Sequence, residues 1–210
     1  MFGDGPLSFQ EYVMHEPLPL ALIHTAVIEF LRGRDDAVLF GAQAVNAYVD
    51  EARATQDVDI LSLRAAELAE EIRAHLKARF HIAVRVREVR EGLGYRIYQI
   101  REPKNRHLVD VRPVASLPPT RQVEQVLVVA PAELIANKVM AYHRRGDKPK
   151  AFTDRRDLAV LLLAFPELKA DTGPVRDRLD AAGAGQAVLE TWRAIVTQVI
   201  RPEDDDEEFS

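Results

Sequence analysis

The chain has 210 residues, and 47% of them are hydrophobic, which supports a real apolar core. It has no run of about 18 apolar residues, so the sequence predicts no membrane-spanning helix. Residues 1–6 lack the basic start and apolar stretch of a signal peptide. The absence of cysteine excludes disulfides, thiolate metal sites and thiol catalysis. These features predict a cytoplasmic protein that has no membrane partner.

The net charge of −5 is concentrated at the C-terminus, where residues 203–208 are six consecutive acids. Without these six residues the net charge would be +1. So dense a charge run cannot pack, and we therefore expect residues 203–210 to form a disordered acidic tail. The rest of the chain is nearly neutral, so composition alone gives no reason to expect a broad nucleic-acid-binding surface.

The first 130 residues combine helical patterns with short apolar runs typical of strands. Helices are expected over residues 18–31, 42–51 and 63–80. Strands are expected over residues 37–40, 58–61, 83–89, 95–101, 107–114 and 123–129, with a hairpin turn at residues 91–94.

The pattern becomes purely helical after Pro131, a residue type that suits the first position of a helix. Helices are expected over residues 132–145, 153–165, 174–182 and 186–200, with Thr153 as an N-cap and a polar loop before it at residues 146–150. The sequence therefore predicts an α+β fold. Residues 1–130 would form a core with a small mixed β-sheet and flanking helices, and residues 131–202 a helical C-terminal lobe.

Asp57 and Asp59 are the most informative residues of the chain, because they lie two positions apart beside a short strand pattern. Side chains alternate along a strand, so both carboxylates are expected on one face, roughly 6–7 Å apart. Two like charges held together are costly unless a cation lies between them. Mg²⁺ takes such oxygen ligands, commonly together with substrate phosphates.

Two further features extend this acidic pair. Asp110 lies within a strand pattern, where aspartate is uncommon, so it is either a functional carboxylate or part of a solvent-facing edge strand. The Gly41-Ala42 step joins a strand to a helix, where backbone N–H groups can bind an anion. None of the six histidines shows metal-ligand spacing with another, and the pattern assigns no role to His107 or His143.

Lys138 and Asp157 are charges within apolar helical stripes, where charged side chains usually need a partner. They form either a structural pair between two helices or a lysine that contacts phosphate with a carboxylate nearby. The segment between these helices is basic and is either a solvated loop or a contact surface for a triphosphate or RNA; its basic residues are Arg144, Arg145, Lys148, Lys150, Arg155 and Arg156.

The chain contains, in this order, a strand, Gly41-Ala42, a helix, Arg53-x-Thr55-x-Asp57-x-Asp59, and then a lone strand aspartate. This order resembles the nucleotidyltransferase superfamily with the DNA-polymerase-β-like core. Residues 130–138 and 154–158, with a lysine on one helix and an Arg-Asp step on the next, are similar to the AbiEii/AbiGii-type nucleotidyltransferases. Many of those proteins are toxins of toxin–antitoxin pairs. The resemblance covers residues 37–165.

The resemblance implies that the protein transfers a nucleoside monophosphate from an NTP to a hydroxyl group. Asp57, Asp59 and Asp110 would hold Mg²⁺ or Mn²⁺, which stabilises the attacking and leaving oxygens. Gly41, Ala42, Arg53, Thr55 and Lys138 would bind the nucleotide, and Asp157 would orient Lys138 or the acceptor. The expected partners are an NTP, an acceptor that is RNA, tRNA or protein, and a cognate antitoxin.

Two other functions stay open at this point. One is a nucleotidyltransferase that modifies a small molecule, such as an antibiotic hydroxyl. The other is a nucleotide-binding or regulatory module without catalysis, because the family usually has glycine or serine where this chain has Ala42. The N–H of Ala42 can still donate a hydrogen bond, but the residue has no hydroxyl.

Overall fold

The computed structural model describes residues 18–90 and 92–202. The expected acidic tail at 203–210 and the first 17 residues lie outside this description. The described part has a seven-stranded mixed sheet with the strand order β3-β4-β5-β2-β1-β7-β6. The strands are β1 (Ala37–Phe40), β2 (Val58–Ser62), β3 (Val84–Val89), β4 (Gly94–Gln99), β5 (Arg106–Pro113), β6 (Thr120–Val123) and β7 (Val126–Val129).

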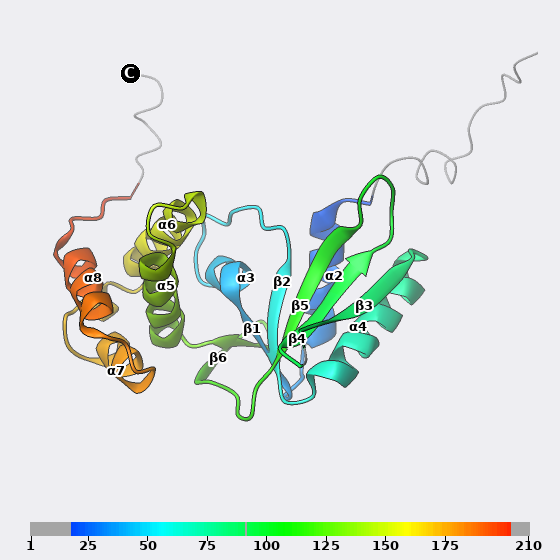
Figure 1. Ribbon diagram of the computed structural model, residues 1–210, viewed down its shortest axis with the longest axis horizontal. Helices are drawn as coiled ribbons and strands as arrows, with labels where there is room; N and C mark the ends of the chain where they lie inside the picture. The colour runs from blue at the N-terminus through cyan, green and yellow to red at the C-terminus, as the bar shows by residue number, and fades with distance from the viewer. Residues whose placement is uncertain (1–17, 91, 203–210) are drawn as a thin grey trace, which may run out of the picture.

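The helices divide between the two sides of this sheet (Figure 1). α2 and α4 cover one face, and α3, α5 and α6 lie on the other side of the central strands. The helices are α2 (Leu20–Leu31), α3 (Gly41–Asn46), α4 (Ala65–Phe80), α5 (Pro131–Arg145), α6 (Pro149–Ala164), α7 (Pro174–Ala181) and α8 (Gln186–Thr197), with a 3₁₀ turn at Pro166–Leu168. The prediction of a mixed α+β fold is confirmed.

Alternation along the strands explains why the two faces of the sheet differ. Val58 and Ile60 on β2 and Val109 and Val111 on β5 are fully buried, whereas Asp59 and Asp110 lie at the intervening positions. Because neighbouring positions point to opposite faces, the valines and isoleucine pack in the core and the aspartates share the other face.

The C-terminal helices pack around α5, which contacts α6, α7 and α8. Trp192 of α8 is fully buried, and its indole N–H donates to the carbonyl of Ala170 at 3.2 Å. Such a satisfied, buried aromatic residue fixes α8 against the preceding segment. None of the helices in the described ranges is long and apolar enough to cross a membrane.

Three predicted elements were wrong in detail. Thr153 is not an N-cap, because α6 already begins at Pro149, whose fixed φ suits the first helical position. The single strand expected over residues 123–129 is a β6–β7 hairpin that turns at Glu124 and Gln125, both with positive φ. The helix expected to reach residue 51 ends at Asn46.

The side chain of Asn46 explains that early end. It donates to the carbonyl of Arg53 at 2.9 Å and accepts from the Arg53 N–H at 3.1 Å. These two bonds hold residues 47–52 as a closed loop and compete with continuation of the helix. The same loop delivers residues 53–57 to the open face of the sheet.

Candidate active site

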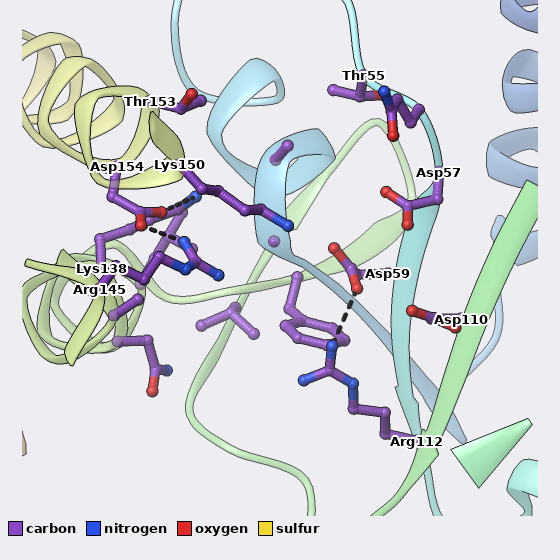
Figure 2. A pocket seen from close by; sticks show the side chains of 18 of the residues that line it. Thr55, Asp57, Asp59, Asp110, Arg112, Lys138, Arg145, Lys150, Thr153 and Asp154 are labelled. Atoms are coloured by element: carbon purple, nitrogen blue, oxygen red, sulfur yellow. Dashed lines mark hydrogen bonds and ion pairs between the residues drawn. The ribbon is translucent and has the colours of Figure 1, made fainter. Parts of the chain in front are cut away.

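A pocket of ≈ 1010 Å³ lies between the open face of the central strands and the helices α3, α5 and α6 (Figure 2). Three aspartates, on or directly before two neighbouring strands, form one wall, and basic residues from α5 and α6 form the opposite wall. Its lining includes Gly41, Ala42, Arg53, Thr55, Asp57, Asp59, Arg96, His107, Asp110, Arg112, Lys138, Arg144, Arg145, Lys150 and Asp154.

The pairing of β2 with β5 brings the three aspartates together. The two strands run parallel, and Asp59 and Asp110 are direct partners in the ladder. Asp57 lies immediately before β2, and all three carboxylates point into the pocket (Figure 2). β5 lies between β4 and β2, so the alternative that Asp110 belongs to a solvent-facing edge strand was wrong.

The turn from β1 into α3 runs beside the Asp59 carboxylate. Gly41, the first residue of α3, has a positive φ of +71°, which favours glycine. A Cβ atom at this position would overlap the carboxylate of Asp59. Gly41 and Ala42 line the pocket, and the first N–H groups of a helix have no acceptor within it.

His107 is a site residue to which the sequence pattern assigns no role. Its Nδ1 lies 3.2 Å from Asp57 Oδ2, and its Nε2 lies 3.1 Å from Asp110 Oδ1. Simple alternation would direct His107 away from Asp110. A β-bulge resets the alternation, because Ile97 pairs with Val109 but Tyr98 pairs with His107, which leaves one residue of β5 without a partner.

The four ionisable groups on this wall have displaced pKa values. Burial, and then the charge of Asp57, raise the pKa of Asp59 to about 6. Burial opposes protonation of His107, but hydrogen bonds with Asp110 and Asp57 outweigh it and raise its pKa to about 10. The hydrogen bond from His107 in turn lowers the pKa of Asp57. Burial would raise the pKa of Asp110, but His107 and Arg96 hold it below its usual value.

Two arginines of the open face complete the set of cations beside the aspartates. The Arg96 Nε donates to Asp110 Oδ1 at 2.9 Å, and the Arg112 Nη2 donates to Asp59 Oδ1 at 3.4 Å. The Arg112 guanidinium also lies over the ring of Phe40, 4.8 Å from its centroid. Each carboxylate on this wall therefore has a positive side chain of the same chain beside it.

A buried ion network holds the opposite wall. Asp157 is fully buried and does not line the pocket. It accepts from Arg53 Nε at 2.7 Å and from Lys138 Nζ at 2.6 Å. Lys138 also lies 3.6 Å from Asp154, which pairs with Arg145. Burial would raise the pKa of Asp157, but these two cations keep it lowered.

The ion network contains two of the residues that the sequence predicts to bind the nucleotide. Lys138 and Arg53 both reach the pocket wall, but their charges already face a buried carboxylate. Thr55 lines the pocket, and its Oγ1 accepts a hydrogen bond from Gln43 Nε2 at 2.8 Å. The network therefore joins the loop before β2 to α5 and α6.

Lys150 lies differently from Lys138. It is exposed at the start of α6, and its side chain extends into the pocket toward the aspartate wall (Figure 2). No described residue forms an ion pair with its amino group. Its charge adds a smaller, lowering contribution to the pKa of both Asp57 and Asp59. The sequence predicts only that Lys150 belongs to a basic cluster, and the fold shows which members of it, Arg144, Arg145 and Lys150, line the pocket.

A mixed sheet with carboxylates on neighbouring strands, facing a cationic helical wall, is the arrangement of the nucleotidyltransferase fold. Two solved structures are similar to this chain in fold. The polyadenylate synthase of Megavirus aligns with 73% of this chain and 33% of its own length, at 13% identity and a TM-score of 0.57. JHP933 from Helicobacter pylori aligns with 90% of this chain and 91% of its own length, at 12% identity and a TM-score of 0.52.

The sequence itself identifies the family more closely. The model of the family described as "Nucleotidyl transferase AbiEii toxin, Type IV TA system" matches residues 26–208. The chain therefore belongs to the AbiEii family of nucleotidyltransferase toxins. No curated protein gives a significant match to it. The resemblance inferred from the aspartate, lysine and Arg-Asp motifs is confirmed.

Proposed function

We propose that the protein transfers a nucleoside monophosphate from an NTP to a hydroxyl group of RNA, tRNA or protein, and that it acts as the toxin of a toxin–antitoxin pair. The observation that carries the proposal is the convergence of Asp57, Asp59 and Asp110 on one wall of a pocket whose opposite wall is basic. A triphosphate needs both: cation-binding carboxylates and positive side chains that face its oxygens.

The carboxylate wall fits a hard divalent cation. Asp59 and Asp110 are ladder partners, and one ligand atom each of Asp57, His107 and Asp110 lie within 4.8 Å of one another. Gly41 lets the backbone of the β1–α3 turn run directly beside the Asp59 carboxylate, which a Cβ atom at this position would overlap. Asp57, Asp59 and Asp110 would hold Mg²⁺ or Mn²⁺. When bound, the cation neutralises phosphate charge and activates the acceptor oxygen.

The residues of the chain supply positioning and charge for the reaction. The acceptor oxygen forms a bond to the α-phosphorus, the bond to the β-phosphate oxygen breaks, pyrophosphate leaves, and the hydroxyl proton passes to solvent. Lys150 faces the aspartates and would neutralise triphosphate oxygens. The backbone amides of Gly41 and Ala42 would donate to the same group.

Arg53, Lys138 and Asp157 would act together on the far wall. Because Asp157 is buried between the two cations, it orients Lys138 and Arg53 rather than touching substrate. Thr55, fixed by Gln43, would border the nucleotide. Catalysis is then mainly a matter of position and electrostatics.

The test uses the full chain with NTPs labelled at the α-phosphate, with and without Mg²⁺ or Mn²⁺, and with cell RNA, protein or small hydroxyl compounds as acceptors. We expect label in RNA or protein only when a divalent cation is present. Asp57→Asn and Asp59→Asn should remove this transfer and leave the circular dichroism spectrum unchanged. Label in a small molecule would instead favour the antibiotic-type alternative, and no labelled product with native protein would contradict catalysis.

The toxin role has its own test. Induced expression of the native chain should arrest growth, and expression of the Asp57→Asn variant should not. A cognate antitoxin is the partner expected for this family, and co-expression with the adjacent gene should restore growth. Equal arrest by both forms would separate toxicity from nucleotide transfer.

A further inference from the structure

Two cross-strand rows of side chains lead from the edge of the sheet to the aspartate wall. In the first row, Arg87 of β3 pairs with Arg96 of β4, Arg96 pairs with Asp110, and Asp110 pairs with Asp59. Directly paired residues point to the same face of a sheet. The row crosses from β3 to β2, which is three strand spacings or about 14 Å.

The second row runs parallel to the first. Arg85 of β3 pairs with Tyr98 of β4, and Tyr98 pairs with His107, which contacts Asp57. The rings of Tyr98 and His107 lie 5.2 Å apart between their centroids. Both rows therefore begin with an arginine at the sheet edge and end at a carboxylate of the pocket.

These arginines lie on the face that the helices leave open. Val84 and Val86, which alternate with Arg85 and Arg87, pack toward the core beneath α4. Arg85 and Arg87 are exposed and form no ion pair with any residue in the described ranges. Like charges directly opposite each other, such as Arg87 and Arg96, destabilise a sheet. Asp110 already offsets the charge of Arg96, whereas Arg87 has no ion-pair partner in the described ranges, so a bound anion would offset the remaining repulsion.

We propose that this arginine row, defined as Arg85, Arg87 and Arg96, binds the phosphate backbone of a single-stranded RNA whose reactive end enters the pocket. The proposal rests on the proposed function, because it names the surface that holds the acceptor. Arginine recognises phosphate in a bidentate way. Tyr98 lies between Arg85 and His107 in the ladder, where an aromatic ring can stack against a base.

An RNA fits this surface better than an acidic protein, for a reason of position. Arg96 both belongs to the row and pairs with Asp110 in the pocket, so the charged surface is continuous with the reaction centre. An RNA backbone that crosses the arginine row would reach the part of the pocket where the acceptor hydroxyl reacts. The positive surface is continuous along this path. An acidic protein bound on the same face would gain nothing from that continuity.

The test measures RNA binding without any reaction. A fluorescein-labelled RNA of 12–20 nucleotides is titrated with the full chain by fluorescence anisotropy, in EDTA and without NTP. The double variant Arg85→Gln/Arg87→Gln should bind roughly 10-fold more weakly at low salt, and the slope of log K against log salt should decrease by about 1.4, as expected for two lost contacts to single-stranded phosphate.

The matched control removes two positive charges elsewhere. Lys77 on α4 and Arg178 on α7 are exposed. α4 covers the opposite face of the sheet and α7 packs against α5, so both helices lie away from the arginine row (Figure 1). The variant Lys77→Gln/Arg178→Gln should retain native RNA affinity, and Arg85→Lys/Arg87→Lys should fall between native and the glutamine variant. Equal binding by native and Arg85→Gln/Arg87→Gln protein would overturn the proposal, as would an equal loss in the control variant or no RNA binding by native protein.

A second titration separates a protein partner from RNA. If polyglutamate binds native protein as tightly as RNA does, and loses affinity to the same extent in Arg85→Gln/Arg87→Gln, the surface serves an acidic protein and the proposal fails. NTP binding and metal-dependent transfer of label from an NTP are measured separately on the same variants. Loss of RNA binding with unchanged NTP binding supports the proposal, whereas absence of transfer in native protein concerns only the proposed function.

Discussion

The backbone of Gly41 and the carboxylate of Asp59 share one space in this fold. Phe40 pairs with Asp59 across the β1–β2 ladder, so the next residue of the chain must turn into α3 directly beside that carboxylate. Gly41 can make this turn because it adopts a φ of +71° and has no Cβ atom to overlap the carboxylate. The strand-to-helix turn and the position of the acidic side chain thus depend on the same residue.

Gly41→Ala should therefore lower the free energy of unfolding by more than an ordinary glycine-to-alanine substitution at positive φ. Gly33 is the matched control, because it has a similar φ of +74° but no atom within 4 Å of an added Cβ. Gly33→Ala should lower the free energy of unfolding by about 1 kcal/mol, the cost of the backbone conformation alone. Gly41→Ala should lower it further and also weaken Mn²⁺ binding, measured by calorimetry. Equal effects in urea unfolding would show that Asp59 moves aside at no cost.

The raised pKa of Asp59 predicts that Asp59→Asn stabilises the metal-free protein at neutral pH. The folded pKa, about 6, lies above the unfolded value of 3.8, so the folded state binds the proton more tightly. The resulting stability is complete below pH 3.8 and is lost as the pH rises through about 6. Above that pH the charged carboxylate costs roughly 2–3 kcal/mol, which the uncharged amide avoids.

The measurement is urea unfolding in EDTA between pH 4 and pH 8. The stability gain of Asp59→Asn should grow with pH across this range, and Asp35→Asn, at an exposed position, should show no such trend. A gain that is equal at both ends of the range would contradict the assignment of burial as its cause.

The aspartate wall could be predicted from the sequence, because Asp57 and Asp59 are neighbours in the chain and strand alternation is a local rule. Asp110 followed from its uncommon place in a strand and from the family resemblance. His107 could not be predicted in the same way. Its direction depends on a bulge in β5, and that bulge exists only in the pairing with β4.

The two lysines show a second limit of sequence reasoning. Lys138 lies in an apolar helical stripe, and its pairing with Asp157 was one of the alternatives derived from the pattern. Lys150 was indistinguishable from five other basic residues nearby. Only the start of α6 at Pro149 directs it into the pocket, whereas the sequence pattern predicts a start four residues later. Likewise, Arg85 and Arg87 are linked to the pocket only through the pairing of β4 with β5 and of β5 with β2.

Asp157→Asn should strongly destabilise the fold, because it leaves Arg53 and Lys138 without their shared buried counter-charge. The expected loss is about 3–5 kcal/mol by urea unfolding at pH 7. The folded pKa of Asp157 is lowered, so its contribution is present above the unfolded pKa of 3.8 and is lost as the pH falls through the folded value. The difference between native and variant should therefore shrink in acid.

The control for this prediction is Asp171→Asn, which breaks the exposed pair with Arg193. Exposed pairs contribute about 0–1 kcal/mol, so this variant should remain close to native. A loss of similar size in both variants would mean that burial of Asp157 between its two cations adds nothing to the stability of the fold.

Lys150→Gln should weaken NTP binding without weakening the fold. Lys150 is exposed and has no ion pair among the described residues, so its removal leaves no buried charge behind. A charge-assisted hydrogen bond contributes about 1.5–3 kcal/mol, so the Kd for an NTP should rise roughly 10-fold or more. Lys148→Gln is the matched control, because this neighbouring lysine is exposed but does not line the pocket. Calorimetry with a non-hydrolysable NTP gives both Kd values. If the Kd is unchanged in Lys150→Gln, and Lys138→Gln loses NTP affinity at native stability, then Lys138 rather than Lys150 contacts the phosphate.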